Sequence, residues 1–290
     1  MAAVSAFIAV DWGTTNRRAW RIEDGRAVDV MRDATGILAV PSDGFADAAA
    51  EIRAKLGDLP MLMAGMVGSN RGWIDAGYVP CPATLDDLAA RLAPAGEDAW
   101  IVPGVRFIAG SRGDVMRGEE VQLLGAVAGG LAPGDATMCQ PGTHCKWARI
   151  EGGTLTRFAT AMTGELFALL RDHALIGAAM KGDVADGPAF RQGVARSGEG
   201  DLTAALFGVR ASSVLALRDD ADAAAYVSGL LIGADCRAQV QPGATVHLLA
   251  DPALGTLYTT AIEAVGGATV PVDSHAAFLA GIIRIRELQS

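Results

Sequence analysis

The sequence lacks the features that mark several large classes of protein. No apolar run reaches the roughly 20 residues needed to cross a bilayer, and the N-terminal residues lack the basic leader of a signal peptide. Only four cysteines occur, with no C-x-x-C pair and no histidine cluster at zinc spacing. These absences predict a reduced, cytoplasmic protein that has neither a disulfide framework nor a structural zinc site.

Positive charge is also scarce. The chain has 24 Lys and Arg residues against 33 Asp and Glu residues, which gives a net charge of −9 over 290 residues. Such a balance disfavours broad binding to a nucleic-acid backbone, although a few converging Arg side chains can still hold a small anion. Aromatic residues make up only 6% of the chain, but hydrophobic residues reach 51% and charged residues 20%. We therefore expect a globular protein of one large domain or two smaller ones.

The common nucleotide and metalloprotease motifs are missing. The sequence contains no G-x-x-x-x-G-K-[ST], no complete G-x-G-x-x-G after a predicted strand, and no H-E-x-x-H. If ATP binds to this chain, it binds through another architecture.

Alternating strands and helices make up most of the chain. Strands are predicted at residues 7–10, 18–22, 27–32, 61–64, 100–102, 137–139, 145–150, 246–250 and 269–272. Helices are predicted at residues 45–56, 118–128, 166–173, 221–238, 254–265 and 276–287. This order, with two similar hairpins, predicts an α/β protein of two lobes. Residues 177–200 mix glycines and charges with few large apolar side chains, so we expect a mobile surface segment there.

The first hairpin carries residues suited to phosphate. We call residues 11–16 hairpin 1; its candidates for binding a nucleotide cofactor are Asp11, Gly13, Thr14, Thr15 and Asn16. Threonine hydroxyls and exposed backbone N–H groups can cradle phosphate oxygens, and Asp11 can hold a hydrated Mg²⁺. The same residue types are common in ordinary turns, so this hairpin alone leaves both interpretations open.

A second hairpin repeats the pattern about halfway along the chain. We call residues 141–144 hairpin 2; Gly142, Thr143 and His144 are its candidate phosphate ligands. The two hairpins could face each other across a cleft and clamp the β- and γ-phosphates. A Cys–His nucleophile at His144 and Cys145 is disfavoured because adjacent residues of a strand point to opposite faces.

These motifs resemble those of the actin-like ATPase and sugar-kinase superfamily. The D-W-G-T-T-N run of hairpin 1 resembles its first phosphate motif, and the P-G-T-H run of hairpin 2 resembles its second. Residues 246–267, which include Asp251, occupy the place of its adenosine motif but lack the usual paired glycines. The resemblance implies a two-lobed, ribonuclease H-like fold in which mixed sheets are flanked by helices around a central cleft, and it implies ATP and Mg²⁺.

A narrower resemblance rests on longer segments. The runs A-V-D-W-G-T-T-N-R-R-A-W, M-A-G-M-V-G-S-N-R-G-W and V-M-R-G-E-E-V-Q-L-L-G-A are similar to those of the 2-dehydro-3-deoxygalactonokinase family. That family implies transfer of the ATP γ-phosphoryl group to the 6-hydroxyl of 2-dehydro-3-deoxy-D-galactonate in galactonate degradation. Three alternatives stay open: a kinase of another sugar acid such as the gluconate-derived epimer, a phosphohydrolase, and a non-catalytic sugar-sensing regulator. The regulator is disfavoured because no basic helical segment precedes Phe7.

Two adjacent carboxylates are candidates for the catalytic base. In related sugar kinases the base is an acidic residue that follows a glycine at the start of a helix, and Gly118-Glu119 has this form. Glu119 is therefore preferred over Glu120, with Asp114 a weaker third candidate. Both glutamates would also favour the dipole of a helix that starts there, so a purely structural role is the alternative.

Several polar residues are candidates for the acceptor and the phosphates. Arg71 and Arg117 could fork onto the carboxylate that this substrate family carries. Ser69 and Asn70 lie in a glycine-rich loop that could reach sugar hydroxyls, and Glu165 belongs either to a cleft-lining loop or to a plain helix start. Two further basic residues follow the hairpins and could touch phosphate; these are Arg17 and Lys146.

The predicted division assigns a role to each lobe. Residues 1–116 would form the acceptor and first-phosphate lobe, residues 117–275 the nucleotide-binding lobe, and residues 276–290 a helix that packs back between them. The expected partners are a small sugar acid and ATP, with no nucleic acid or membrane, and a homodimer is left open.

Overall fold

The computed structural model describes residues 6–289, which form two compact units. Unit 1 comprises the described residues up to Asp135, the segment Arg149–Phe158 and the residues from Asp273 onward. Unit 2 comprises Ala136–Ala148 and Ala159–Val272. Within the described part of the chain, no helix has the length and apolar character required to span a membrane.

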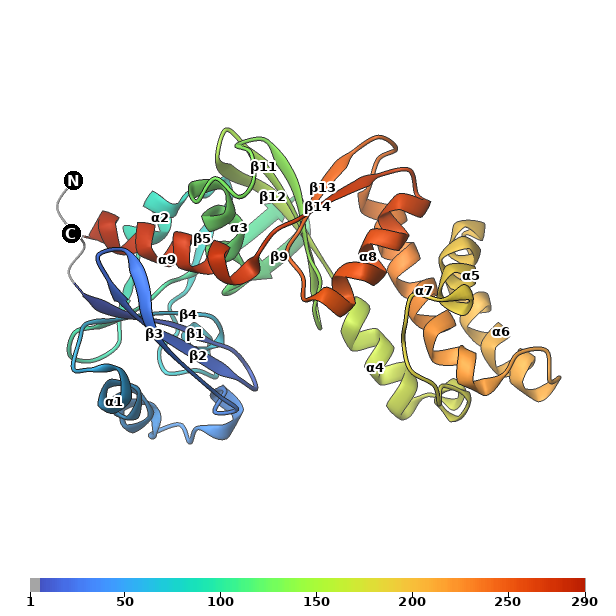
Figure 1. Cartoon of the computed structure of the whole chain (residues 1–290), viewed down its shortest axis with the longest axis horizontal. Helices are drawn as coiled ribbons and strands as arrows, with labels where there is room; N and C mark the ends of the chain where they lie inside the picture. Colours follow the sequence, from blue (N-terminus) through green and yellow to red (C-terminus); the bar gives the residue numbers. More distant parts are fainter. Residues whose placement is uncertain (1–5, 290) are drawn as a thin grey trace. The chain divides into compact units, whose positions relative to one another are not determined.

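Unit 1 holds two sheets and four α-helices (Figure 1). Its strands are β1 (Phe7–Trp12), β2 (Arg17–Glu23), β3 (Arg26–Asp33), β4 (Met61–Ala64), β5 (Tyr78–Pro80), β6 (Ala93–Pro94), β7 (Ala99–Ile101), β8 (Gly104–Ala109) and β9 (Arg112–Met116). Its helices are α1 (Phe45–Leu56), α2 (Leu85–Ala89), α3 (Glu119–Ala128) and α9 (Ser274–Gln289), with short 3₁₀ turns η1 (Ile37–Ala39) and η2 (Met66–Gly68).

Unit 2 is built on a third sheet and is rich in helix. Its strands are β10 (Ala136–Gln140), β13 (Thr245–Leu248) and β14 (Ala268–Pro271), and it shares β11 (Cys145–Glu151) and β12 (Thr154–Ala161) with unit 1. Its helices are α4 (Thr163–His173), α5 (Pro188–Arg196), α6 (Leu202–Val214), α7 (Asp220–Gln239) and α8 (Pro252–Ala264), with 3₁₀ turns η3 (Leu175–Ala179) and η4 (Ser197–Glu199).

The same strand order recurs in the two large sheets. The first sheet runs β3-β2-β1-β4-β7-β6, and the third runs β12-β11-β10-β13-β14. In the first, β1 pairs antiparallel with β2 and parallel with β4; in the third, β10 pairs parallel with β13. In the first sheet an antiparallel meander, β3-β2-β1, is extended by the parallel strands β4 and β7 and closed by β6, which pairs antiparallel with β7; in the third sheet β10, β13 and β14 run parallel. This arrangement of mixed sheets with flanking helices in two units is the α/β class that the sequence predicted.

Burial explains why these segments form these elements. The first four residues of β1 and all four of β4 are buried, as expected for central strands covered on both faces, whereas β3 is an exposed edge strand. Helix α1 buries Phe45, Ile52 and Leu56 at helical spacing and ends at Gly57, whose φ of 104° suits a residue without Cβ. Both α1 and β4 have the bounds that the sequence predicted.

A close helix pair places α3 in unit 1. A Cβ added to Gly125 of α3 would lie 2.1 Å from the Ala277 carbonyl oxygen, and one added to Gly281 of α9 would lie 2.2 Å from the Val121 carbonyl oxygen. Only glycine permits this backbone approach. Residues 117–135 therefore belong to the same compact unit as α9 and the N-terminal sheet. The observed division differs from the predicted boundary at residue 116 because this packing was not visible in the sequence.

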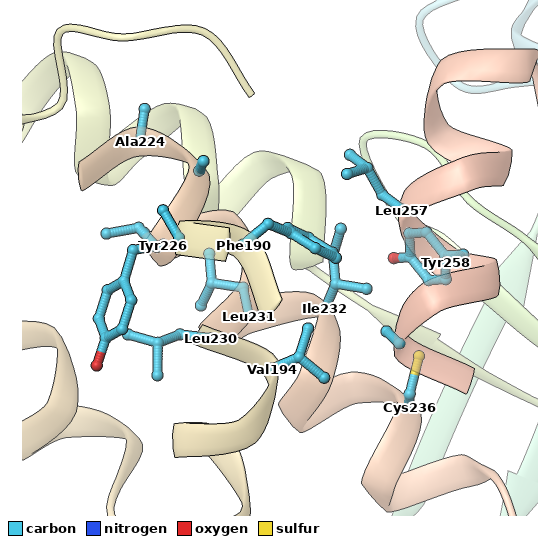
Figure 2. Packing of buried hydrophobic residues seen from close by; sticks show 14 of the residues in the cluster. Phe190, Val194, Ala224, Tyr226, Leu230, Leu231, Ile232, Cys236, Leu257 and Tyr258 are labelled. Carbon is cyan, nitrogen blue, oxygen red and sulfur yellow. The ribbon is translucent and has the colours of Figure 1, made fainter. Parts of the chain in front are cut away.

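Residues 177–200 were predicted to be a mobile surface segment, and their central part, α5, is instead buried in the core of unit 2. They contain α5, which packs against α7: Phe190 and Val194 are buried in the core of unit 2 together with Leu230 and Tyr226 (Figure 2). A Cβ added to Gly193 would lie 2.1 Å from the Tyr226 carbonyl oxygen. Gly193 thus permits close packing of α5 on α7, which corrects the prediction of a surface location for Pro188–Arg196.

Candidate functional site

In hairpin 1 three carbonyl groups are hydrogen-bonded to the segment 36–38, whereas three backbone N–H groups are left without a partner among the described residues. The carbonyl oxygens of Gly13, Thr14 and Thr15 accept hydrogen bonds from the N–H groups of Ile37, Leu38 and Gly36, at 3.0, 3.2 and 3.1 Å. Within residues 6–289, no hydrogen bond engages the N–H groups of Thr14, Thr15 or Asn16. A loop with tied carbonyls and unengaged N–H groups is suited to hold an oxyanion.

A glycine makes this backing possible. A Cβ added to Gly36 would lie 2.3 Å from the Thr15 carbonyl carbon and 2.4 Å from the Thr14 oxygen, so only glycine allows the segment to pack against the loop. The Trp12 indole N–H donates to the nearby Thr35 carbonyl at 3.0 Å and secures the same contact. The loop is therefore tied to residues 35–38 by four hydrogen bonds.

A pocket of about 420 Å³ adjoins hairpin 1. It is lined by residues of all three strands of the meander and the loop: Asp11, Gly13, Thr14, Thr15, Asn16, Arg17, Arg18, Arg32 and Asp33. Burial raises the pKa of Asp11 to about 6; the charge of Arg18 opposes this rise and the charge of Glu119 adds to it. All five predicted ligands of hairpin 1 thus line one pocket, with Glu119 close enough to influence Asp11 electrostatically.

Two glycines bring the start of α3 to the end of β1. A Cβ on Gly65 would lie 2.8 Å from the Trp12 carbonyl oxygen, and one on Gly118 would lie 3.0 Å from the Gly65 Cα. Both glycines have positive φ, 100° and 102°, which other residues rarely adopt. Hairpin 1, the loop after β4 and the first turn of α3 therefore meet at Gly65.

The two candidate base residues differ sharply in environment. Glu120 is fully buried, and both of its carboxylate oxygens accept the Gly118 N–H, at 2.8 and 2.7 Å. Burial raises the pKa of Glu120 to about 8, the Glu119 charge adds to this, and backbone N–H groups and Arg117 oppose it. Glu119 is only partly buried, and its Oε2 accepts the Arg117 N–H at 3.0 Å. Of the two, only Glu119 presents surface to a ligand.

Arg17 borders the pocket, but its guanidinium group is held by other groups of the protein. Its side chain is 2% exposed and is held by Asp33 at 3.0 Å, by the Ala48 carbonyl at 3.0 Å and by Glu51 at 3.3 Å. Burial would raise the pKa of Asp33, but hydrogen bonds from Arg17 and from Thr35 lower it overall. Arg17 is therefore an internal tie between the meander and α1, and the structure places Arg18 beside Asp11 instead.

The predicted substrate loop follows β4. Ser69 is buried and its hydroxyl accepts the Arg71 N–H at 3.3 Å, while Asn70 and the Arg71 side chain are exposed. Arg117 lies beneath this loop: a Cβ on Gly68 would be 3.0 Å from its Nη1. The loop and Arg117 are thus brought together, and Arg71 extends to solvent.

The Arg117 guanidinium is buried, and only some of its hydrogen-bond donors are engaged. Nη2 donates to the Gly77 carbonyl at 3.0 Å and lies 3.7 Å from Asp75, and the guanidinium stacks 4.4 Å from the centre of the Tyr78 ring. Among the described residues, Nε and Nη1 of Arg117 have no hydrogen-bond partner. Buried unpaired donors are costly, so this side chain has capacity for a further acceptor.

Hairpin 2 is held by the first turn of α4. The Glu165 N–H donates to the Thr143 carbonyl at 2.9 Å, and the Glu165 carboxylate lies 2.6 Å from Nε2 of His144. A Cβ on Gly164 would be 2.4 Å from the Gly142 carbonyl oxygen, so this contact also requires glycine. Glu165, predicted as a substrate ligand, therefore contacts hairpin 2.

Two pockets adjoin hairpin 2 and share Gly142, Gly164 and Leu254. One measures about 380 Å³ and is lined by hairpin 2 and α4, including Glu165 and Asp172. The other measures about 250 Å³ and is mostly apolar, with side chains from α4, α7 and α8. Asp251 caps α8 by accepting the N–H groups of Ala253 and Leu254 at 2.9 and 3.0 Å. Sequence patterns gave no signal for the apolar pocket, because its side chains come from three separate helices.

A buried carboxylate that the sequence analysis missed ties this region together. Asp235 of α7 accepts hydrogen bonds from the Trp147 indole at 2.9 Å, the Thr163 hydroxyl at 2.9 Å and the Tyr258 hydroxyl at 3.3 Å. Burial raises the pKa of Asp235, and hydrogen bonds from Thr163, Trp147, Cys145 and Tyr258 oppose the rise. Because Thr163 begins α4, Asp235 helps to fix the turn that holds hairpin 2. An acidic residue inside an apolar helix was the available signal.

Among the described residues, no group of three or more His, Cys, Asp or Glu side chains could hold a metal ion by itself. Asp11 supplies one carboxylate beside a loop suited to phosphate. That donor set fits an ion carried by a polyphosphate, because Mg²⁺ is usually bound by one or two carboxylates together with substrate phosphates and waters.

Comparison with known proteins identifies the family of this chain. The model of the 2-keto-3-deoxy-galactonokinase family matches residues 11–285. The 2-dehydro-3-deoxygalactonokinase of Escherichia coli (strain K12) is 37% identical over 282 residues, which cover 95% of this chain and 96% of that protein. A crystal structure of a Sinorhizobium meliloti protein, described as a candidate 2-dehydro-3-deoxygalactonokinase, has a TM-score of 0.90 at 37% identity and covers 96% of this chain and 97% of that one.

A more distant structure supports the fold alone. The activator of the 2-hydroxyisocaproyl-CoA dehydratase from Clostridium difficile, with bound ADPNP, has a TM-score of 0.50 at 12% identity and covers 98% of this chain and 95% of that one. The family match spans nearly the whole chain and includes both hairpins, the loop after β4 and the start of α3. The chain therefore belongs to the 2-keto-3-deoxy-galactonokinase family.

Proposed function

We propose that the chain transfers the γ-phosphoryl group of ATP to the 6-hydroxyl of 2-dehydro-3-deoxy-D-galactonate, as a step of galactonate degradation. Family membership supports this activity. The structural observation that carries it is hairpin 1, whose unengaged N–H groups face a pocket beside a carboxyl group. Phosphoryl transfer depends mainly on positioning and on stabilising the charge of phosphate oxygens, and such a loop supplies both.

Each hairpin is proposed to bind phosphate. In unit 1, the N–H groups of Thr14, Thr15 and Asn16 and the two threonine hydroxyls would donate to phosphate. Gly13, whose own N–H donates to the Asn16 carbonyl at 2.9 Å, would let phosphate approach because it has no side chain, and in unit 2 Gly142 and Thr143 would play the same parts. Asp11 would hold Mg²⁺ through water. That ion, when bound, neutralises part of the charge on the phosphate oxygens.

Glu119 is proposed as the base that accepts the proton of the acceptor hydroxyl. It is partly exposed near Asp11, whereas Glu120 is fully buried and its carboxylate is engaged with Gly118. A base must come within hydrogen-bond reach of the proton it removes, and a side chain without exposed surface cannot do this. Glu120 would instead cap the first turn of α3 from inside.

The acceptor is proposed to lie against the loop after β4. Ser69 and Asn70 would meet its hydroxyls, and Arg117, with Arg71 as the exposed alternative, would meet its carboxylate. Because the Glu165 carboxylate pairs with His144, we propose that these two residues position hairpin 2. The apolar pocket near Asp251 is the candidate place for the adenine ring, since a planar base needs apolar walls.

Each unit would bind one of the two substrates. Unit 1 would bind the acceptor with the base, and unit 2 would bind the nucleotide. Four cysteines without a disulfide support a reducing, cytoplasmic location. A homodimer stays a prediction, which light scattering of the purified chain would test.

A coupled assay of ADP release tests the activity. Purified protein should release ADP with 2-dehydro-3-deoxy-D-galactonate, and little ADP without an acceptor. The gluconate-derived epimer, which differs in the direction of one hydroxyl, serves as the matched control. Faster turnover with the epimer would move the assignment to another sugar acid, and equal turnover without any acid would indicate a phosphohydrolase.

Two single substitutions test the base. Glu119→Gln should lower kcat by about 100-fold or more, because a positioned general base contributes about 10²- to 10⁴-fold. Glu120→Gln is the matched control: it is adjacent and isosteric, and its kcat should stay within several-fold of the wild type. Near-normal turnover in both variants would refute the assignment of the base.

A further inference from the structure

Cross-strand pairing aligns three charged residues in one row beside hairpin 1. Asp11 of β1 lies opposite Arg18 of β2, and Arg18 lies opposite Arg32 of β3. Successive residues of a strand face opposite sides of a sheet, and directly opposed residues share a side. Asp11, Arg18 and Arg32 therefore share one face of the meander.

The neighbouring row consists of Trp12, Arg17 and Asp33, whose side chains take the opposite face of the meander. Arg17 and Asp33 also border the pocket, but their charges are paired with each other. Arg17 is held there by Asp33 at 3.0 Å, and its guanidinium carbon lies 5.2 Å from the centre of the Trp12 ring. The positive charge of Arg17 is therefore offset within the protein by Asp33 and Glu51.

The first row is not neutralised. Arg18 and Arg32 line the pocket of about 420 Å³, and Asp11 is the carboxyl on their face of the sheet there. Within residues 6–289, neither arginine has a carboxylate within 4.0 Å, and the buried Nε of Arg18 has no hydrogen-bond partner. Two arginines without a carboxylate partner thus line one pocket in a chain whose net charge is −9.

The packing holds Arg18 in this position despite the repulsion. Its guanidinium lies 5.7 Å from the centre of the Trp20 ring, and Trp20 stacks on Phe278 of α9 at 5.2 Å. Burial lowers the pKa of Arg18, the charge of Arg32 lowers it further, and Asp11 opposes both. On α9, burial and then the Arg18 charge lower the pKa of His275. The cost of holding two like charges together is recovered when an anion binds between them.

We propose that Arg18 and Arg32 form an anion-binding subsite that takes an oxyanion of a bound substrate next to hairpin 1. The inference rests on the proposed kinase function, which supplies two such oxyanions: the terminal phosphate of ATP and the carboxylate of the acceptor acid. Both groups present paired oxygens that match the fork of a guanidinium. The chemistry is the same, and binding measurements separate the two sources.

Direct binding calorimetry on three variants tests the subsite. Arg18→Met and Arg32→Met each remove one guanidinium but keep an apolar side chain of similar reach. Arg26→Met, on the exposed edge strand β3, is the matched control and should bind every ligand as the wild type does. The probes are a non-hydrolysable triphosphate analogue of ATP, ADP, and 2-dehydro-3-deoxy-D-galactonate.

We expect both variants to bind one oxyanion about ten- to a hundredfold more weakly, as expected for hydrogen bonds to a charged group. If the triphosphate analogue is weakened while ADP and the acid are not, the ligand is the terminal phosphate. If only the acid is weakened, the ligand is its carboxylate. Dissociation constants within twofold of the wild type for all three probes, in both variants, would overturn the proposal.

Two features keep this test decisive. The Arg32 side chain belongs to an exposed residue, so Arg32→Met should fold even if Arg18→Met, which loses its contact with Trp20, does not. Binding is measured without turnover, so failure of the proposed function is a separate result. A wild-type protein that makes no ADP with either acid would refute the kinase activity, whereas the binding constants alone decide the subsite.

Discussion

Glu120 and Gly118 form a close contact at the start of α3: both oxygens of the buried carboxyl accept the same N–H, at 2.8 and 2.7 Å. The contact links the glycine that lets α3 approach Gly65 to the first turn of the helix. It also places a titratable group where water cannot solvate its charge, so the stability of unit 1 should depend on pH.

The pH dependence of stability should change in Glu120→Gln. Burial raises the pKa of Glu120 from about 4.5 to about 8, so the folded state binds this proton more tightly than the unfolded state. Its contribution to stability is complete below the unfolded pKa and is lost as pH rises through the folded pKa. Urea unfolding between about pH 5 and pH 8 should show a steeper loss of stability for the wild type than for Glu120→Gln. Parallel curves would show that Glu120 does not titrate in this way.

The α3–α9 contact should not tolerate a methyl group. Gly281→Ala would place its Cβ 2.2 Å from the Val121 carbonyl oxygen, and overpacking of this kind costs about 1–3 kcal/mol or more. Gly208→Ala, inside α6 with nothing within 4 Å of the added Cβ, is the control and should gain about 0.5–1 kcal/mol from helix propensity. Urea unfolding should separate the two variants. Equal stability would contradict the close approach.

The sequence was sufficient for elements whose pattern is local. Helix α1 and strand β4 have the predicted bounds because an apolar repeat and a terminating Gly57 mark them. It failed for β5, β8 and β9, which form a three-stranded sheet of short or largely exposed strands without regular alternation. These strands owe their position to pairing with each other, which no local pattern reports.

The candidate site was predicted in part for the same reason. Hairpin 1 and Glu119 are recognisable because their residue types occur together in a short segment. Only Arg17 was named as a possible phosphate contact, and the position of Arg18 opposite Asp11 was not recognised, because it depends on which face each strand position takes. Arg17, one residue earlier in β2, is held by Asp33 and Glu51. Asp235 was missed because its donors, Trp147, Thr163 and Tyr258, are distant in sequence.

The buried helix α5 should behave as core. Phe190 is fully buried, and Phe→Ala in a core typically costs about 3–5 kcal/mol. Phe207→Ala is the matched control, since Phe207 of α6 is 69% exposed and should change stability little. Amide hydrogen exchange should also be slow across Pro188–Arg196. Fast exchange there, or equal effects of the two substitutions, would restore the prediction of a mobile segment.

Asp235 should matter to nucleotide binding through the position of α4. In Asp235→Asn, the amide keeps one acceptor but presents N–H groups to three donors, so at least one buried donor loses its partner at a cost of about 1–3 kcal/mol. Thr163 starts α4, and the next two residues of that helix hold hairpin 2, so the KM for ATP should rise more than kcat falls.

Asp219→Asn is the control, because Asp219 is the N-cap of α7, the helix that contains Asp235, and Asn and Asp cap equally well. Steady-state kinetics with ATP and the acid varied separately would check this split. An unchanged KM for ATP in a destabilised Asp235→Asn would limit Asp235 to folding, and a fall in kcat alone would place its effect on the chemical step.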